Sequence, residues 1–118
     1  MRGDEKRVVD AFCRWLEGQG WTVARNVAFV DVVAKRNDER LYAEAKGRTA
    51  DMGTDLDTLY GQLLRWVPNE EVGKVRLGVV VPVEGRAAAL GVQPRVRQLL
   101  SIDVFVVDES GTIELVRA

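Results

Sequence analysis

The sequence contains no histidine, which excludes Ser-His-Asp triads, cysteine–histidine pairs and histidine-ligated zinc sites. Its single cysteine, Cys13, excludes both a cysteine-only zinc site and an internal disulfide. The two serines, Ser101 and Ser110, stand in expected turns beside no recognisable base. No glycine-rich phosphate loop occurs, because Gly18 and Gly20 precede an expected strand rather than a helix. The chemistry that remains available is that of carboxylates, lysine and water activated by a metal ion.

Long apolar runs and a charge imbalance are also missing. The longest apolar stretch, residues 77–83, is interrupted by Gly78 and Pro82 and is too short to cross a bilayer. The N-terminal segment has helically spaced apolar residues instead of the continuous apolar block of a signal peptide. Together with the lone cysteine, this predicts a cytoplasmic protein with no membrane contact. The net charge of −1 lacks the strongly basic balance of many nucleic-acid binders, although a local basic surface stays open.

The length and the spacing of apolar residues indicate one domain over residues 1–118, with 47% hydrophobic residues to form its core. The pattern predicts a helix over 5–18, strands over 21–27, 29–35 and 40–47, a helix over 56–67 with a capping box at 54–57, a strand over 74–83, a short helix over 94–100, and strands over 102–107 and 112–116. The order α-β-β-β-α-β-α-β-β is typical of the α/β class, with a mixed sheet flanked by helices.

Two carboxylates stand on neighbouring strands of a predicted hairpin whose turn is at 36–39. Pairing across this turn can bring Asp31 and Glu44 close together. Both lie in largely apolar rows, where a lone ionised carboxylate is costly to bury, and two close carboxylates repel each other. A divalent cation between them removes that conflict. Asp31, Glu44 and a nearby backbone carbonyl, that of Ala45, suit Mg²⁺ with water completing the octahedron, and Mn²⁺ could substitute.

Lys46 points to the same side of its strand as Glu44, because side chains alternate along a strand. It could orient or deprotonate an attacking water and stabilise developing negative charge. The alternative is an ordinary same-face pair of Glu44 and Lys46 on a solvated strand. The upstream Asp31, the hairpin geometry and the lack of any other catalytic set favour the catalytic interpretation.

Residues 29–34 (FVDVVA) and 41–47 (LYAEAKG) resemble the motif of the PD-(D/E)xK nuclease superfamily, which includes restriction endonucleases, Holliday-junction resolvases and repair exonucleases. The preceding helix, the following helix and the following strand also fall in the superfamily's order, and Val30 stands at the position of the motif's proline. The resemblance implies a restriction-endonuclease-like core, with the two carboxylates as metal ligands and Lys46 as the catalytic lysine.

The same resemblance adds residues outside the hairpin. Many members carry a first-helix carboxylate near the metal, and helical geometry favours Glu5 over Asp4 or Asp10, with a simple helix-start carboxylate as the alternative. Some members carry a glutamine in the helix after the lysine strand, and Gln62 is the matching candidate. Arg48 directly follows that strand and is the candidate for a phosphate contact. An ordinary exposed side chain is the alternative for Gln62 and for Arg48.

Other notable side chains favour structural roles. Cys13 lies on the apolar stripe of the first helix, which predicts a buried thiol. Trp15, Trp21 and Trp66 could stack on bases, but their positions at element ends and helix flanks favour packing. Tyr60 is expected in the core.

The leading hypothesis is a metal-dependent nuclease that hydrolyses phosphodiester bonds of DNA as an endonuclease, with RNA still open as a substrate. A domain of this size has little surface for reading sequence, so we expect a homodimer or a larger protein partner. The second hypothesis is a non-catalytic nucleic-acid-binding or protein-interaction module on the same fold. A structural α/β domain whose motif is accidental is the third. The intact set of Asp, Glu and Lys favours the first hypothesis.

Overall fold

A computed structural model of the protein describes residues 3–117. Its helices and strands are α1 (Gly3–Gly18), β1 (Thr22–Val27), β2 (Val30–Arg36), β3 (Glu39–Ala45), α2 (Met52–Trp66), β4 (Arg76–Pro82), α3 (Arg86–Ala89), α4 (Pro94–Leu99), β5 (Ile102–Val107) and β6 (Ile113–Val116), with short 3₁₀ turns at Asn69–Glu71 and Val83–Gly85. The predicted α/β class and most of the predicted order of elements are confirmed. No helix within this part of the chain is long and apolar enough to span a membrane.

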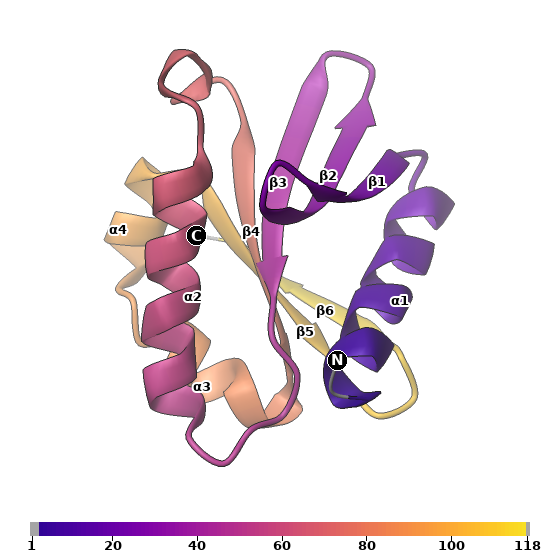
Figure 1. Ribbon diagram of the computed structural model, residues 1–118, viewed down its shortest axis with the longest axis vertical. Helices are drawn as coiled ribbons and strands as arrows, with labels where there is room; N and C mark the ends of the chain where they lie inside the picture. The colour runs from indigo at the N-terminus through magenta and orange to yellow at the C-terminus, as the bar shows by residue number, and fades with distance from the viewer. Residues whose placement is uncertain (1–2, 118) are drawn as a thin grey trace.

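The six strands form one mixed sheet in the order β1-β2-β3-β4-β5-β6. Strands β1, β2 and β3 are antiparallel neighbours, β3, β4 and β5 run parallel, and β6 is antiparallel to β5. The two parallel connections pass through helices, since a parallel pair needs a crossover. Figure 1 shows α1 on one side of the sheet and α2, α3 and α4 on the other, so the molecule has three layers.

Each face of the sheet has its own hydrophobic core. The apolar stripe of α1 packs on one face, where its fully buried Phe12 meets Phe105 at a ring-centroid distance of 4.8 Å. The apolar stripe of α2 covers the other face, where the Tyr60 hydroxyl donates to the carbonyl of Ala89 at 2.6 Å. Strands β4 and β5 are buried on both faces, which explains their nearly continuous apolar sequences. Cys13 is 2% exposed in the α1 core, so the predicted burial of its thiol is confirmed.

The start of α2 corrects the prediction of a capping box at 54–57. The helix begins at Met52, and its N-cap is Asp51, whose carboxylate accepts the backbone N–H of Thr54 at 3.1 Å. An aspartate in this position satisfies one of the free N–H groups of the first turn, so the helix starts earlier than the apolar spacing alone indicates. Helix α3 and the two 3₁₀ turns were not predicted, because each is only a few residues long.

Candidate functional site

The candidate site lies where the β2–β3 hairpin opens. The backbone pairing of the two strands runs from the turn to Val32 opposite Ala43 and stops before the two carboxylates. Beyond that point the Asp31 N–H donates to the Glu44 Oε2 at 3.0 Å, and the Ala45 N–H donates to the Asp31 Oδ2 at 2.9 Å. The carboxylates therefore bridge the strands in place of ladder hydrogen bonds. The structure brings Asp31 and Glu44 together, as the hairpin predicts.

The two carboxylates border an open pocket of about 240 Å³. Its walls come from the first turn of α1, the β1–β2 turn, the facing ends of β2 and β3, and one side of α2. The lining residues are Glu5, Phe29, Asp31, Glu44, Ala45, Lys46, Leu59, Gln62 and Trp66. Every residue that the sequence assigns to the site is therefore at this pocket, with the exception of Arg48.

Burial determines the electrostatics of the pocket. The Glu44 side chain is 5% exposed, and desolvation raises the pKa of its carboxyl to about 7. The Asp31 N–H and the charge of Lys46 oppose that rise, whereas the charges of Asp31 and Glu5 add to it. Burial also raises the pKa of Asp31, against the Ala45 N–H and Lys46. Two perturbed carboxyls in one pocket are typical of a functional site.

Lys46 enters the pocket directly after the last residue of β3. Its backbone N–H donates to the carbonyl of Val80 at 3.0 Å, which holds the start of the loop against β4. In the part of the chain that the structure describes, no carboxylate lies within ion-pair distance of the Lys46 ammonium. The cation is therefore available to a ligand in the pocket.

A glycine lets α1 approach the end of β3. A side chain on Gly47 would place its Cβ 2.3 Å from the backbone nitrogen of Glu5, so only glycine fits this contact. The Asp4 carboxylate accepts the backbone N–H of Arg48 and thereby fastens the first turn of α1 to the same loop. Glu5 consequently lines the pocket, whereas Asp10 pairs with cations outside it. Of these three acidic residues, Glu5 is the one that lines the pocket.

The two remaining predicted residues differ in position. Gln62 lines the pocket from α2 and is otherwise exposed to solvent. Arg48 is exposed, and its guanidinium lies 3.8 Å from the Glu84 carboxylate outside the pocket lining. A phosphate contact by Arg48 would therefore involve substrate that extends beyond the pocket.

The donor set of the pocket fits Mg²⁺. Across residues 3–117, no three His, Cys, Asp or Glu side chains converge into a metal-binding group, so Glu5 does not complete a three-carboxylate cluster. Mg²⁺ is commonly held by one or two carboxylates and keeps several waters. Asp31, Glu44 and the carbonyl of Ala45 supply such a set, and a cation between the carboxylates would offset the cost of ionising both.

An aromatic wall beside the carboxylates was not predicted. The rings of Phe29 and Trp66 stack with centroids 5.2 Å apart and an interplanar angle of 27°. The spacing of one helical turn between Gln62 and Trp66 is a sequence signal for one of the two rings. The left-handed turn that carries Phe29 has no such signal. Both rings border the pocket.

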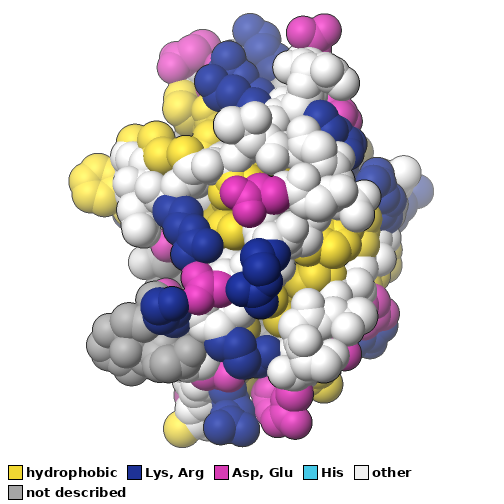
Figure 2. All heavy atoms as spheres, turned by 90° about the vertical axis from the view of Figure 1, so that its right-hand side faces the viewer, with side chains coloured by type: hydrophobic (Ala, Val, Ile, Leu, Met, Phe, Trp, Pro, Cys, Tyr) yellow, Lys and Arg dark blue, Asp and Glu magenta, His cyan; other side chains and the backbone are white. Residues whose placement is uncertain are grey.

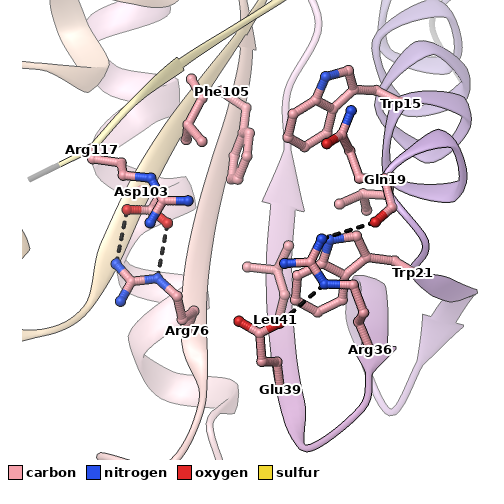
Figure 3. A pocket seen from close by; sticks show the side chains of 12 residues that line it. Trp15, Gln19, Trp21, Arg36, Glu39, Leu41, Arg76, Asp103, Phe105 and Arg117 are labelled. Atoms are coloured by element: carbon pink, nitrogen blue, oxygen red, sulfur yellow. Dashed lines mark hydrogen bonds and ion pairs between the residues drawn. The ribbon is translucent and has the colours of Figure 1, made fainter.

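A second hollow, of about 170 Å³, lies at the opposite end of the sheet (Figure 3). There Arg76 forms two hydrogen bonds with the buried Asp103, at 2.9 and 2.8 Å. Arg36 lies over the ring of Trp21 at 4.5 Å and donates to Glu39 at 3.0 Å. Both carboxylates of this hollow are thus already neutralised by arginines, so it lacks the uncompensated pair that would draw a metal ion.

The outer face of α1 carries charges of both signs side by side (Figure 2). Asp10 accepts hydrogen bonds from Lys6 and from Arg25, each at 2.7 Å. A nucleic-acid backbone binds best to a surface of positive charge alone. This face is therefore a poor platform for such a backbone.

Comparison with known proteins identifies the fold. No family model and no curated protein matches the sequence. Solved structures do match. An XisH family protein from Nostoc punctiforme superposes with a TM-score of 0.62 and 16% identity, over 94% of this chain and 99% of that one. An fdxN element excision controlling factor protein from Anabaena variabilis superposes with a TM-score of 0.61 and 16% sequence identity, over 95% of this chain and 99% of that one. The chain shares their fold.

Proposed function

We propose that the protein is a Mg²⁺-dependent phosphodiesterase that cuts DNA internally. One observation carries the proposal: two carboxylates with raised pKa values, Asp31 and Glu44, face a single pocket together with Lys46, which forms no ion pair within residues 3–117. Ionising both carboxylates in a half-buried pocket is unfavourable, and a divalent cation bound between them would offset that cost. The PD-(D/E)xK resemblance assigns the same three residues to catalysis.

Each residue would have a distinct task. Asp31, Glu44 and the Ala45 carbonyl would hold Mg²⁺, which when bound supplies positive charge at the phosphoryl oxygen and lowers the pKa of water. Lys46 would orient the attacking water and stabilise the negative charge that develops at phosphorus. Glu5 would accept a hydrogen bond from water at the edge of the pocket. The water oxygen would form a bond to phosphorus and lose a proton to solvent, while the opposite phosphorus–oxygen bond would break and the leaving oxygen would take up a proton from solvent. The product would be a nicked strand.

The name of one structural neighbour favours DNA over RNA as the substrate. One neighbour is named for controlling the excision of an element, and excision of an element from a genome requires that DNA strands be cut. A nuclease that acts in DNA rearrangement would agree with both that name and the chemistry of the pocket.

A non-catalytic module on the same fold is the second candidate, and a specific observation favours it. Both carboxylates accept backbone N–H groups of the facing strand, so they also serve as a clip that holds the hairpin ends together. A clip needs acceptors but no negative charge. Replacing a carboxylate by its amide therefore separates the two candidates.

The experiment compares wild type, Asp31→Asn and Glu44→Gln in cleavage of supercoiled plasmid, single-stranded and branched DNA with Mg²⁺ or Mn²⁺. Asp38→Asn is the matched control, since Asp38 is exposed in the turn of the same hairpin. The proposal predicts cleavage by wild type and the control, and a loss of at least about a hundredfold in both amide variants. Equal cleavage by all four proteins would show a contaminant, and no cleavage of any substrate would favour the module.

A further inference from the structure

Phe29 is an exposed aromatic side chain without a place in either core. It is 78% exposed, and its described ring contact is the stack on Trp66 at 5.2 Å. Exposing a large aromatic ring forgoes the stabilisation that its burial would bring. The position of this ring at the mouth of the carboxylate pocket therefore calls for a role other than packing.

The backbone that carries Phe29 is in an unfavourable conformation. Ala28 and Phe29 connect Val27 to its partner Val30, and both have positive φ angles, 48° and 74°. Two-residue turns of this kind strongly prefer asparagine and glycine, because a Cβ is crowded in the left-handed region. Asparagine or glycine at these two positions would therefore make the turn more stable than Ala28 and Phe29 do. Strain of this type is typical of functional sites.

The stacked rings continue the wall of the pocket on the side of α2. Phe29 stands in the β1–β2 turn two residues before Asp31, and Trp66 lies one helical turn after Gln62; all four residues line the pocket. A strand whose phosphate lies at Asp31 and Glu44 would place a neighbouring base near these rings. The pocket thus places an apolar wall for a base beside the carboxylates that would hold the metal ion and, through it, the phosphate.

We propose that Phe29, supported by Trp66, stacks on an unpaired base next to the cleaved phosphate, so that the substrate is DNA with a single-stranded or frayed segment. This inference rests on the proposed nuclease function. Bases in a duplex are stacked on each other, and only an unpaired or extruded base can reach an aromatic side chain. The net charge of −1 gives little general attraction for a duplex backbone, so stacking supplies affinity that electrostatics does not.

The test uses Phe29→Asn, because asparagine tolerates the left-handed conformation and removes the ring. The matched control is Leu99→Asn, which removes an apolar side chain of the same 78% exposure from α4. Binding of a labelled oligonucleotide, single-stranded or in a blunt duplex, is measured with Ca²⁺ replacing Mg²⁺, alongside the melting temperature. Cleavage of both forms with Mg²⁺ is measured in parallel.

For Phe29→Asn we expect about tenfold weaker binding of the single strand, unchanged binding of the duplex and a melting temperature equal to or above that of wild type. Leu99→Asn should bind both forms as wild type does. Unchanged single-strand binding by Phe29→Asn, an equal loss for the duplex, or a lowered melting temperature would overturn the inference. If the wild type cleaves DNA but any of these results is found, the stacking inference fails and the proposed nuclease function remains supported. If the wild type cleaves neither form, the proposed function is overturned as well.

Discussion

The Glu44 carboxylate accepts the backbone N–H of Asp31 at 3.0 Å, and the Asp31 carboxylate accepts the N–H of the residue after Glu44 at 2.9 Å. The two acids thus close the hairpin at the point where its backbone pairing ends. Their hydrogen bonds favour the ionised forms, but burial outweighs them and raises both pKa values. The hydrogen bonds of the two side chains therefore hold the strand ends together, whereas ionising both carboxyls still costs free energy.

The first prediction concerns stability and pH. The pKa of Glu44 in the folded protein is about 7, above its ordinary value of 4.5, so its ionisation opposes folding. The penalty is absent below pH 4.5, grows between 4.5 and 7, and is complete above 7. Without divalent metal, Glu44→Gln should therefore be more stable than wild type at pH 8, by at most roughly 3 kcal/mol. The glutamine carbonyl can still accept the Asp31 N–H.

Urea denaturation of wild type and Glu44→Gln at pH 8 and at pH 4 tests this prediction. The difference in free energy of unfolding should shrink as the pH falls. A difference that instead grows toward acid pH would mean that Glu44 is stabilised as a carboxylate, contrary to its burial.

The second prediction separates catalysis from metal binding. Lys46→Met removes the cation beside the pair while leaving Asp31 and Glu44 in place. Because the charge of Lys46 lowers the pKa of both carboxyls, its loss should leave metal binding intact at alkaline pH, where both acids are ionised. The rate of cleavage should fall by about a hundredfold or more, since stabilisation of the developing charge is lost.

Cleavage rates and Mg²⁺ affinity of Lys46→Met and Lys46→Arg are measured at pH 8.5. The arginine variant retains the charge and should keep part of the rate. Equal activity of Lys46→Met and wild type would remove Lys46 from the mechanism.

The third prediction concerns the contact between α1 and the end of β3. Gly47→Ala introduces a Cβ at 2.3 Å from the Glu5 nitrogen, so the first turn of α1 must move. We expect a loss of about 1–3 kcal/mol in stability and slower cleavage as Glu5 leaves the pocket. The control is Gly61→Ala on the exposed side of α2, where a Cβ meets nothing within 4 Å. It should stabilise the protein by about 0.5–1 kcal/mol.

Thermal unfolding and cleavage assays of both alanine variants check this contrast. If Gly47→Ala were as stable and as active as wild type, the close approach of α1 would have no role in the site.

Sequence patterns predicted the features that local periodicity encodes. The alternation along β3 put Lys46 on the same side as Glu44, and the turn at 36–39 set the pairing that brings Asp31 and Glu44 together. The nearly continuous apolar sequence of residues 102–107 predicted β5 with the bounds that the structure has. Glu5 could be placed on the inner side of α1, but its approach to the pocket depends on the tertiary contact with Gly47.

Other features depend on a choice between alternatives that are equally good in the sequence. Asp51 and Thr54 are both good N-cap residues, and the helix begins at the earlier one. The left-handed turn at Ala28 and Phe29 contains neither glycine nor asparagine, the residues that usually indicate such a turn. The sequence therefore did not predict the turn or the exposure of the Phe29 ring. Trp66 was expected to pack, and its stack on Phe29 instead borders the pocket.

Calorimetric titration of Mg²⁺ into wild type and Asp31→Ala at pH 8 measures whether Asp31 and Glu44 hold a metal ion. Asp38→Ala serves as the control, since it removes an exposed aspartate from the turn of the same hairpin. A metal centre at Asp31 and Glu44 predicts saturable Mg²⁺ binding by wild type and the control, and its loss in Asp31→Ala. Binding that is equal in all three proteins, or absent from wild type, would contradict a metal centre at Asp31 and Glu44.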